Sequence, residues 1–131
     1  MAGVVPNAAE VDVANYTLNK STPQDLLLKL YVSNTTPAET DTAGTFTEAT
    51  EDGYAAITLN GAAWTVNSGN PTSASTAAQV FDITETGSFY GYFGVRATSG
   101  VIAFAERFSG APFVLPGGGG EITVTPTYTF T

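Results

Sequence analysis

The chain has 131 residues, a formal net charge of -8, and neither cysteine nor histidine. This length fits one domain with its own core, and the missing residue types exclude disulfides, thiolate metal sites and imidazole chemistry. Four basic residues against twelve acidic ones also argue against binding to a nucleic-acid backbone, which needs clustered lysine and arginine.

The first twenty residues predict an N-terminal arm, residues 1–20, that contains a short helix. Asn7-Ala8-Ala9-Glu10 has the spacing of a capping box. Three apolar residues then recur at helical intervals: Val11, Ala14 and Leu18. We therefore expect a helix over about 8–18, which either packs over one end of a sheet or docks on a neighbouring subunit. The remainder, 21–131, is expected to be a single β domain.

The stretch 26–32 reads LLLKLYV and predicts a strand, because its apolar residues alternate. Even-numbered positions share one face, and Leu27, Lys29 and Tyr31 share the other. The stretch 34–52 is rich in threonine and carries five acids. We expect it to be mostly an exposed loop, with a short strand near 45–47.

Asn60-Gly61 lies between two alternating stretches and is a type I′ turn signal. It predicts a β-hairpin over 54–66, followed by a loop at 67–71. The small polar stretch 72–78 gives no clear assignment. Residues 79–84 predict a strand with Phe81 and Ile83 pointing inward.

Residues 89–108 form the predicted centre of the fold, as two strands joined by a turn at 98–100. On the first strand one face is wholly apolar: Phe89, Gly91, Phe93, Val95 and Ala97. The other face holds Tyr90, Tyr92 and Arg96. On the second strand, Ile102, Phe104 and Phe108 are expected to share a face. Two strands alone are marginal, so a second sheet must cover these aromatics.

The last third of the chain continues the β pattern. Residues 113–115 form a short apolar piece, and Gly117 to Gly120 predict a flexible loop. Residues 121–131 alternate apolar side chains with threonine, and Pro126 restricts this strand to an edge or a bulge. About seven or eight strands and one helix favour an all-β fold, an antiparallel two-sheet sandwich that is jelly-roll-like.

The candidate chemistry in the sequence is weak. The four glycines at 117–120 lack the Lys-Ser/Thr end and the helix of a phosphate loop, so a turn is expected. Glu51-Asp52-Gly53 is a fragment of a calcium loop without its alternating acids, which favours a solvated turn. Glu48, Glu106 and Glu121 could form a glycosidase pair, but Glu106 beside Arg107 is more typical of an ion pair or a sheet corner. We expect no enzyme activity, no cofactor and no metal.

Seven residues are candidate partner contacts: Tyr31, Tyr90, Tyr92, Glu39, Asp41, Val11 and Leu18. Exposed tyrosines on a sheet can anchor a protein partner or stack on a sugar, and otherwise they lie buried under a second layer. We favour the protein contact. The acidic loop could meet basic patches on a partner, and binding would then depend on salt.

Several runs carry a family resemblance: VPNAAE, DLLLKLYVSNTTPAETDT, GYAAITLNGAAWTV, YGYFGVRATSGVIAFAERFSGAPFV and the threonine-alternating end. Together they resemble small virion proteins of tailed bacteriophages. The resemblance implies a small β-sandwich on a capsid or tail, most commonly a capsid decoration or cement protein. Such a protein binds the major capsid protein and its own copies, as a dimer or trimer, on the capsid surface of a virion assembled in the host cytoplasm.

No catalytic residues come with this resemblance. An alternative is a receptor- or glycan-binding module of a tail fibre or baseplate, which the tyrosines would suit. No apolar run approaches the roughly 20 residues of a membrane span, and the first residues lack the pattern of a signal peptide. We therefore expect no membrane partner and no general export.

Overall fold

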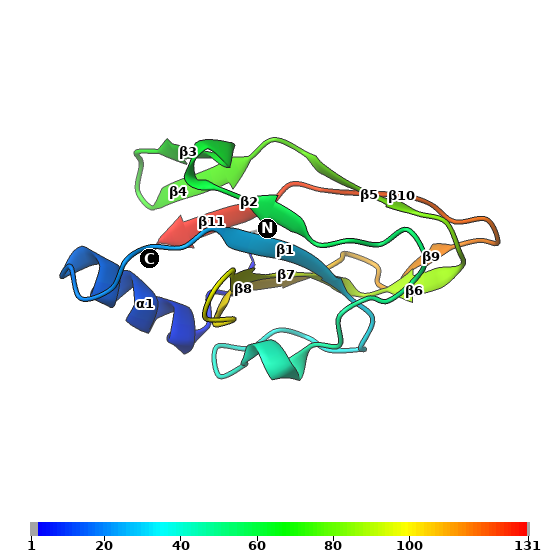
Figure 1. Cartoon of the computed structure of the whole chain (residues 1–131), viewed down its shortest axis with the longest axis horizontal. Helices are drawn as coiled ribbons and strands as arrows, with labels where there is room; N and C mark the ends of the chain where they lie inside the picture. Colours follow the sequence, from blue (N-terminus) through cyan, green and yellow to red (C-terminus); the bar gives the residue numbers. More distant parts are fainter. Residues whose placement is uncertain (1–2, 131) are drawn as a thin grey trace.

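The computed structural model describes residues 3–130, which form a mostly β fold with one α-helix and antiparallel strands (Figure 1). In chain order the elements are α1 (Asn7–Thr17), β1 (Leu26–Tyr31), η1 (Ala43–Thr45), β2 (Ile57–Leu59), η2 (Gly61–Ala63), β3 (Trp64–Asn67), β4 (Thr72–Thr76), β5 (Gln79–Ile83), β6 (Gly87–Phe89), β7 (Gly91–Arg96), β8 (Ile102–Arg107), β9 (Phe113–Leu115), β10 (Gly120–Val124) and β11 (Thr127–Phe130). The prediction of a β fold with a short N-terminal helix is confirmed. Thr131 of the predicted last strand lies outside the described residues.

The largest sheet has four strands in the order β2-β1-β7-β8. Its β7–β8 pair is the predicted centre of the fold, and the turn between the two strands ends at Gly100 with φ of 73°. The N-terminal segment lies along the outer edge of β8, because Val4 and Ala105 exchange two backbone hydrogen bonds of 2.8 and 3.0 Å. Residues 3–5 thus extend this sheet beyond β8.

The other strands form three small sheets, β11-β4-β3, β10-β5 and β6-β9. These sheets follow one another along the chain, since β4 leads into β5 and β10 leads into β11. At the junction the Thr76 amide donates to the Pro126 carbonyl at 3.3 Å. The single strand predicted over 121–131 is instead divided at Pro126 into β10 and β11, which belong to different sheets. The edge position that Pro126 predicts is confirmed for β11. Figure 1 shows β3, β4 and β11 at one end of the molecule and β6 and β9 at the other.

The main core is formed by residues from the four-stranded sheet and from the three small sheets. Its largest members are Leu26, Leu28, Leu30, Leu59, Phe81, Ile83, Phe89, Tyr92, Phe104, Leu115, Ile122, Val124 and Tyr128. The alternation predicted for β1, β5 and β10 is confirmed by this set. The short piece 113–115 and the unassigned stretch 72–78 are both strands, β9 and β4.

A second core cluster covers the opposite face of the four-stranded sheet. It contains Tyr31, Phe46, Phe93, Val95, Ile102 and Ala105. Phe46 comes from the long loop before β2, and its ring lies 5.2 Å from the Phe93 ring and 4.8 Å from the Tyr31 ring. The expectation of an exposed loop is therefore wrong at Phe46 and Ala49, which are 6% and 3% exposed. Instead of a strand at 45–47, the loop has the short helix η1 and one bridge, from Glu48 to Tyr31.

The predicted hairpin over 54–66 is wrong. Asn60 has φ of -81° and ψ of 173°, and its side chain accepts a hydrogen bond from the Ala63 amide, so it begins the short helix η2. This cap competes with the turn that Asn60-Gly61 suggests. Consequently β2 pairs with β1, β3 pairs with β4, and the chain crosses between two sheets at this point.

The predicted faces of the central strands also need correction. Gly94 pairs with Phe104 and Val95 with Ile102, so β8 carries a bulge with one extra residue. Ile102 therefore lies in the second cluster, while Phe104 lies in the main core with Tyr92. Tyr92 lies on a buried face of β7, and Phe93 on the opposite face belongs to the cluster that also contains Phe46 of the loop and contacts Ala8 of α1.

Helix α1 begins and ends one residue earlier than predicted, and it packs against the chain's own β8. The predicted capping box does not form, because Pro6 occupies the cap position and no side chain caps the helix. Ala9 is buried, whereas Val11 and Leu18 are 60% and 66% exposed. The apolar residues selected by helical spacing therefore point outward.

Candidate functional site

Two of the three candidate tyrosines are in the interior. Tyr31 and Tyr92 are 0% and 6% exposed. The Tyr31 hydroxyl donates to the Thr35 carbonyl at 3.0 Å, and the Tyr92 hydroxyl donates to the Glu106 carboxylate. Burial raises the pKa of Tyr31 to about 12. Their predicted exposure is wrong, and neither side chain is available at the surface.

The other candidate contacts remain at or near the surface. Tyr90 is half-buried, with the Arg107 guanidinium 5.2 Å from its ring centre. Glu39 is exposed, and the half-buried Asp41 accepts a hydrogen bond from the Ala38 amide at 2.7 Å. The Asn7 amide donates to the Glu39 carbonyl at 2.9 Å, so the acidic loop lies beside the start of α1. The structure thus brings the loop and the helix together, and the same loop covers Tyr31 through Phe46.

Two of the three acids considered for catalysis have other partners, and the third, Glu121, is exposed on β10. Glu48 accepts hydrogen bonds from the Lys29 ammonium at 3.0 Å and from the Tyr54 hydroxyl at 2.9 Å. Burial and this carboxylate raise the pKa of Tyr54 well above its ordinary value. Glu106 binds the Tyr92 hydroxyl in place of the predicted ion pair with Arg107. The pKa of Tyr92 is raised in the same way, first by burial and then by Glu106, so this hydroxyl stays a donor.

The two glycine-containing motifs are turns. Gly53 has φ of 84° and lies against β5, where the Thr84 amide donates to the Asp52 carbonyl at 2.8 Å. Gly118 and Gly119 have φ of 90° and 78° and connect β9 to β10. Among residues 3–130, no group of three or more acids, cysteines or histidines is placed to hold a metal. Within the same range, no helix is long and apolar enough to cross a membrane.

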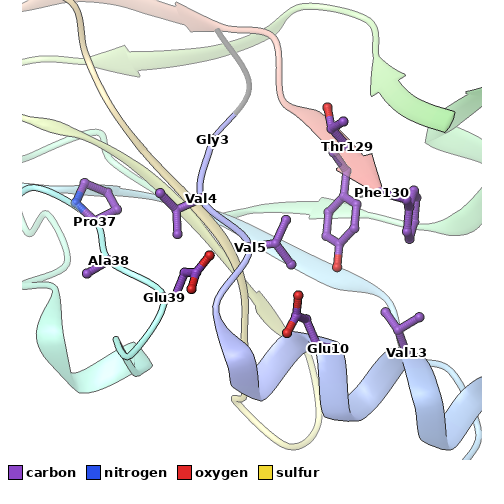
Figure 2. A pocket seen from close by; sticks show the side chains of 11 residues that line it. Gly3, Val4, Val5, Glu10, Val13, Pro37, Ala38, Glu39, Thr129 and Phe130 are labelled. Atoms are coloured by element: carbon purple, nitrogen blue, oxygen red, sulfur yellow. The ribbon is translucent and has the colours of Figure 1, made fainter. Parts of the chain in front are cut away.

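A cleft of about 640 Å³ lies between the N-terminal segment, α1, the loop near residue 38 and β11 (Figure 2). We call it the β11 cleft. Its lining residues are Gly3, Val4, Val5, Glu10, Val13, Pro37, Ala38, Glu39, Tyr128, Thr129 and Phe130. The volume falls within the range of about 300–1,000 Å³ that is typical of ligand sites.

The β11 cleft combines apolar walls with negative charge. Glu10 comes from α1 and Glu39 from the loop, and the eleven lining residues include no lysine or arginine. Tyr128 is 8% exposed, and its hydroxyl is buried without a hydrogen-bond partner among the described residues. Burial raises the pKa of Tyr128. A buried hydroxyl with no partner is costly, so a ligand group that bonds to it would gain affinity.

An apolar groove of about 310 Å³ adjoins the cleft and shares Val13, Tyr128 and Phe130 with it. Its remaining lining is Tyr16, Thr17, Leu26, Trp64, Val66, Ala74 and Arg96. Val66 and Phe130 are 67% and 43% exposed, so both depressions open to the surface. Arg96 is held in place by Asp12, whose carboxylate lies 3.3 Å from the Arg96 Nε, and by the Tyr16 ring.

Sequence reasoning missed Glu10, Tyr128 and Phe130 as site residues. Glu10 was explained by the predicted capping box, and the two aromatics were explained by the alternation of the last strand. The only available signal was that Pro126 makes this strand an edge, because an edge has a free side for a partner.

No protein-family model, curated protein or solved structure was found to match this chain.

Proposed function

We propose that this protein is a non-enzymatic structural protein of a tailed-bacteriophage virion, and that it acts as a capsid decoration or cement protein. In this role it binds the major capsid protein and its own copies on the capsid surface and stabilises the shell. No cofactor and no catalytic residue take part.

The observation that supports this proposal is that the central sheet is covered on both faces while large apolar side chains remain exposed on several elements. Both faces of the four-stranded sheet are covered by segments of the same chain, and most buried polar groups are bonded to one another. Seven large apolar residues nevertheless face outward: Val11, Leu18, Val66, Val80, Phe113, Val114 and Phe130. A protein that works by fit between surfaces needs this combination.

The proposed architecture is a two-sheet, jelly-roll-like sandwich. One layer would be the four-stranded sheet, and the other would be the succession of small sheets from β6–β9 to β3. The main core, which draws residues from both groups, supports this arrangement. A sandwich of this kind resists shear, which suits a clamp on a shell.

The proposal is tested by adding the purified protein to stripped or undecorated phage shells. Saturable binding at a fixed ratio to the major capsid protein is expected, together with higher resistance of the shell to heat. Val11→Asp with Leu18→Asp should weaken the binding, whereas Thr123→Asp with Thr125→Asp, which adds the same charge at exposed positions outside this apolar set, serves as the matched control. No binding to shells at any salt concentration would refute the proposal.

The alternative role, a receptor- or glycan-binding module of a tail fibre or baseplate, is motivated by surface tyrosines. Only Tyr90 of the three candidates keeps part of its ring at the surface. Binding to host cells or to a glycan array that is lost in Tyr90→Ala, without binding to shells, would favour this role.

A further inference from the structure

We propose that the β11 cleft receives an extended segment of the partner protein, which pairs with the edge of β11 and places one lysine or arginine against Glu10 and Glu39. This inference rests on the proposed function, because it names the kind of segment through which a shell protein would be held. It assigns a binding mode, a chemical class of partner and the residues that recognise it.

The edge of β11 has backbone groups free for a partner strand. Within residues 3–130, β11 pairs with β4 on one side only. Pro126 accepts a hydrogen bond from Thr76, and bonded and non-bonded pairs alternate in an antiparallel ladder. Tyr128 and Phe130 therefore bond to β4, and Thr127 and Thr129 turn their backbone groups to the other edge. Thr129 lines the cleft, so an added strand would enter it.

The opposite wall of the cleft is also extended backbone. Both backbone groups of Val4 are bonded to Ala105, so those of Gly3 and Val5 point away from β8. Figure 2 shows this segment facing Thr129 and Phe130, with α1 below them. An extended segment in the cleft would therefore lie between two edges that belong to different sheets.

The charge of the cleft selects a basic side chain. Glu10 and Glu39 contribute two carboxylates to a lining without any cation, in a chain of net charge -8. The aliphatic stem of a lysine or arginine would pack on Val5, Val13 and Phe130, while its charged end reaches the carboxylates. The Tyr128 hydroxyl is buried, so side chains over it would have to move before the same segment could supply its missing partner. Acidic segments and nucleic acid are disfavoured by the same charge.

A second copy of this chain fits the cleft poorly. The chain has four basic residues, and three of them already contact groups within their own chain: Lys29, Arg96 and Arg107. The fourth, Lys20, lies in the turn after α1 rather than in an extended segment. The occupant is therefore a segment of a different protein.

The test is a selection of randomised eight-residue displayed peptides on the full chain. Selected peptides are expected to carry one lysine or arginine among alternating apolar or β-branched residues. A synthetic peptide of the selected sequence should shift the amide resonances of Thr127 and Thr129 in the isotope-labelled protein.

The charge requirement is tested with variants of the protein. Glu10→Gln with Glu39→Gln should weaken binding of the peptide about tenfold to a hundredfold, since charge-assisted hydrogen bonds are lost. The control protein, Glu121→Gln with Glu85→Gln, loses the same charge away from the cleft. Its affinity for the peptide should change by less than about twofold at moderate salt.

The results separate the inference about the β11 cleft from the proposed function. Peptides without a basic residue, resonance shifts outside the cleft, or equal weakening by the control pair would overturn the inference. Normal shell binding by the Glu10→Gln, Glu39→Gln protein would overturn it too, while leaving the proposed function intact. Peptide binding in the cleft by a protein that never binds shells would instead refute the proposed function and keep the cleft as a peptide site.

Discussion

Phe46→Ala is the substitution that best tests how the long loop before β2 is held. The Phe46 side chain is 6% exposed and lies between the rings of Tyr31 and Phe93. Removing a buried phenylalanine costs about 3 to 5 kcal/mol, and loss of aromatic pairs is part of that cost. Because a loop can partly relax into the space, we expect the unfolding free energy to fall by about 3 kcal/mol.

Urea unfolding measures this loss as a shift in midpoint of about 1.5 M for an m-value of about 2 kcal/mol/M. Thr47→Ala, at an exposed neighbouring position, is the matched control and should stay within about 0.5 kcal/mol. Hydrogen exchange adds a local readout, because the Val32 and Ala49 amides bond across the loop at 2.9 and 3.0 Å. A loss below about 1 kcal/mol with unchanged exchange at these amides would refute the anchored loop.

Three further predictions concern a partly buried ion pair, a turn and the tyrosines. Asp12→Asn removes the carboxylate that lies 3.3 Å from the Arg96 Nε, so urea unfolding should show a loss of about 1.5 kcal/mol in unfolding free energy, and a loss under about 0.5 kcal/mol would contradict this. Gly119→Ala should lower the unfolding free energy by at least about 2 kcal/mol, because φ is 78° and a Cβ would overlap a backbone carbonyl of β5. Gly117→Ala is the control and should leave the unfolding free energy nearly unchanged, because a Cβ there meets no neighbouring atom. The pKa of Tyr31 is raised to about 12, so the unfolded chain, whose tyrosines titrate near about 10, loses protons first. The unfolding free energy should therefore fall as pH rises from about 10 to 12, and urea unfolding of Tyr31→Phe should show a smaller slope.

The parts of the fold that could be predicted are those set by local alternation. In β1 the prediction that Leu28 and Leu30 share a face is confirmed, and in β5 Phe81 and Ile83 point inward as predicted. Pro126 predicted an edge or a bulge for a covalent reason, since it has no amide hydrogen to donate. These predictions need no knowledge of which strands are neighbours.

The errors arise where long-range pairing overrides a local signal. Asn60 suits both a tight turn and a cap, and the pairing of β2 with β1 decides for the cap. The bulge in β8 moves Phe104 and Ile102 to different clusters, and no feature of a single strand reveals it. Tyr92 is a candidate contact in the sequence because it lies opposite the wholly apolar face, but both faces of the sheet are covered and Glu106 bonds to its hydroxyl in the interior.

The candidate site depends even more on long-range arrangement. Its walls come from residues 3–5 and Glu10 at one end of the chain and from β11 (Thr127–Phe130) more than a hundred positions later. Alternation shows which side chains share a face of one strand, but it does not show which two sheet edges face each other. The sequence marked β11 as an edge through Pro126, and only the fold puts Glu10 and the Tyr128 hydroxyl beside that edge. The edge of β11 offers backbone hydrogen bonds to any added strand, which alone would favour aggregation. The carboxylates of Glu10 and Glu39 restrict the added strand to one with a basic side chain. The β11 cleft is therefore specific because it combines the two.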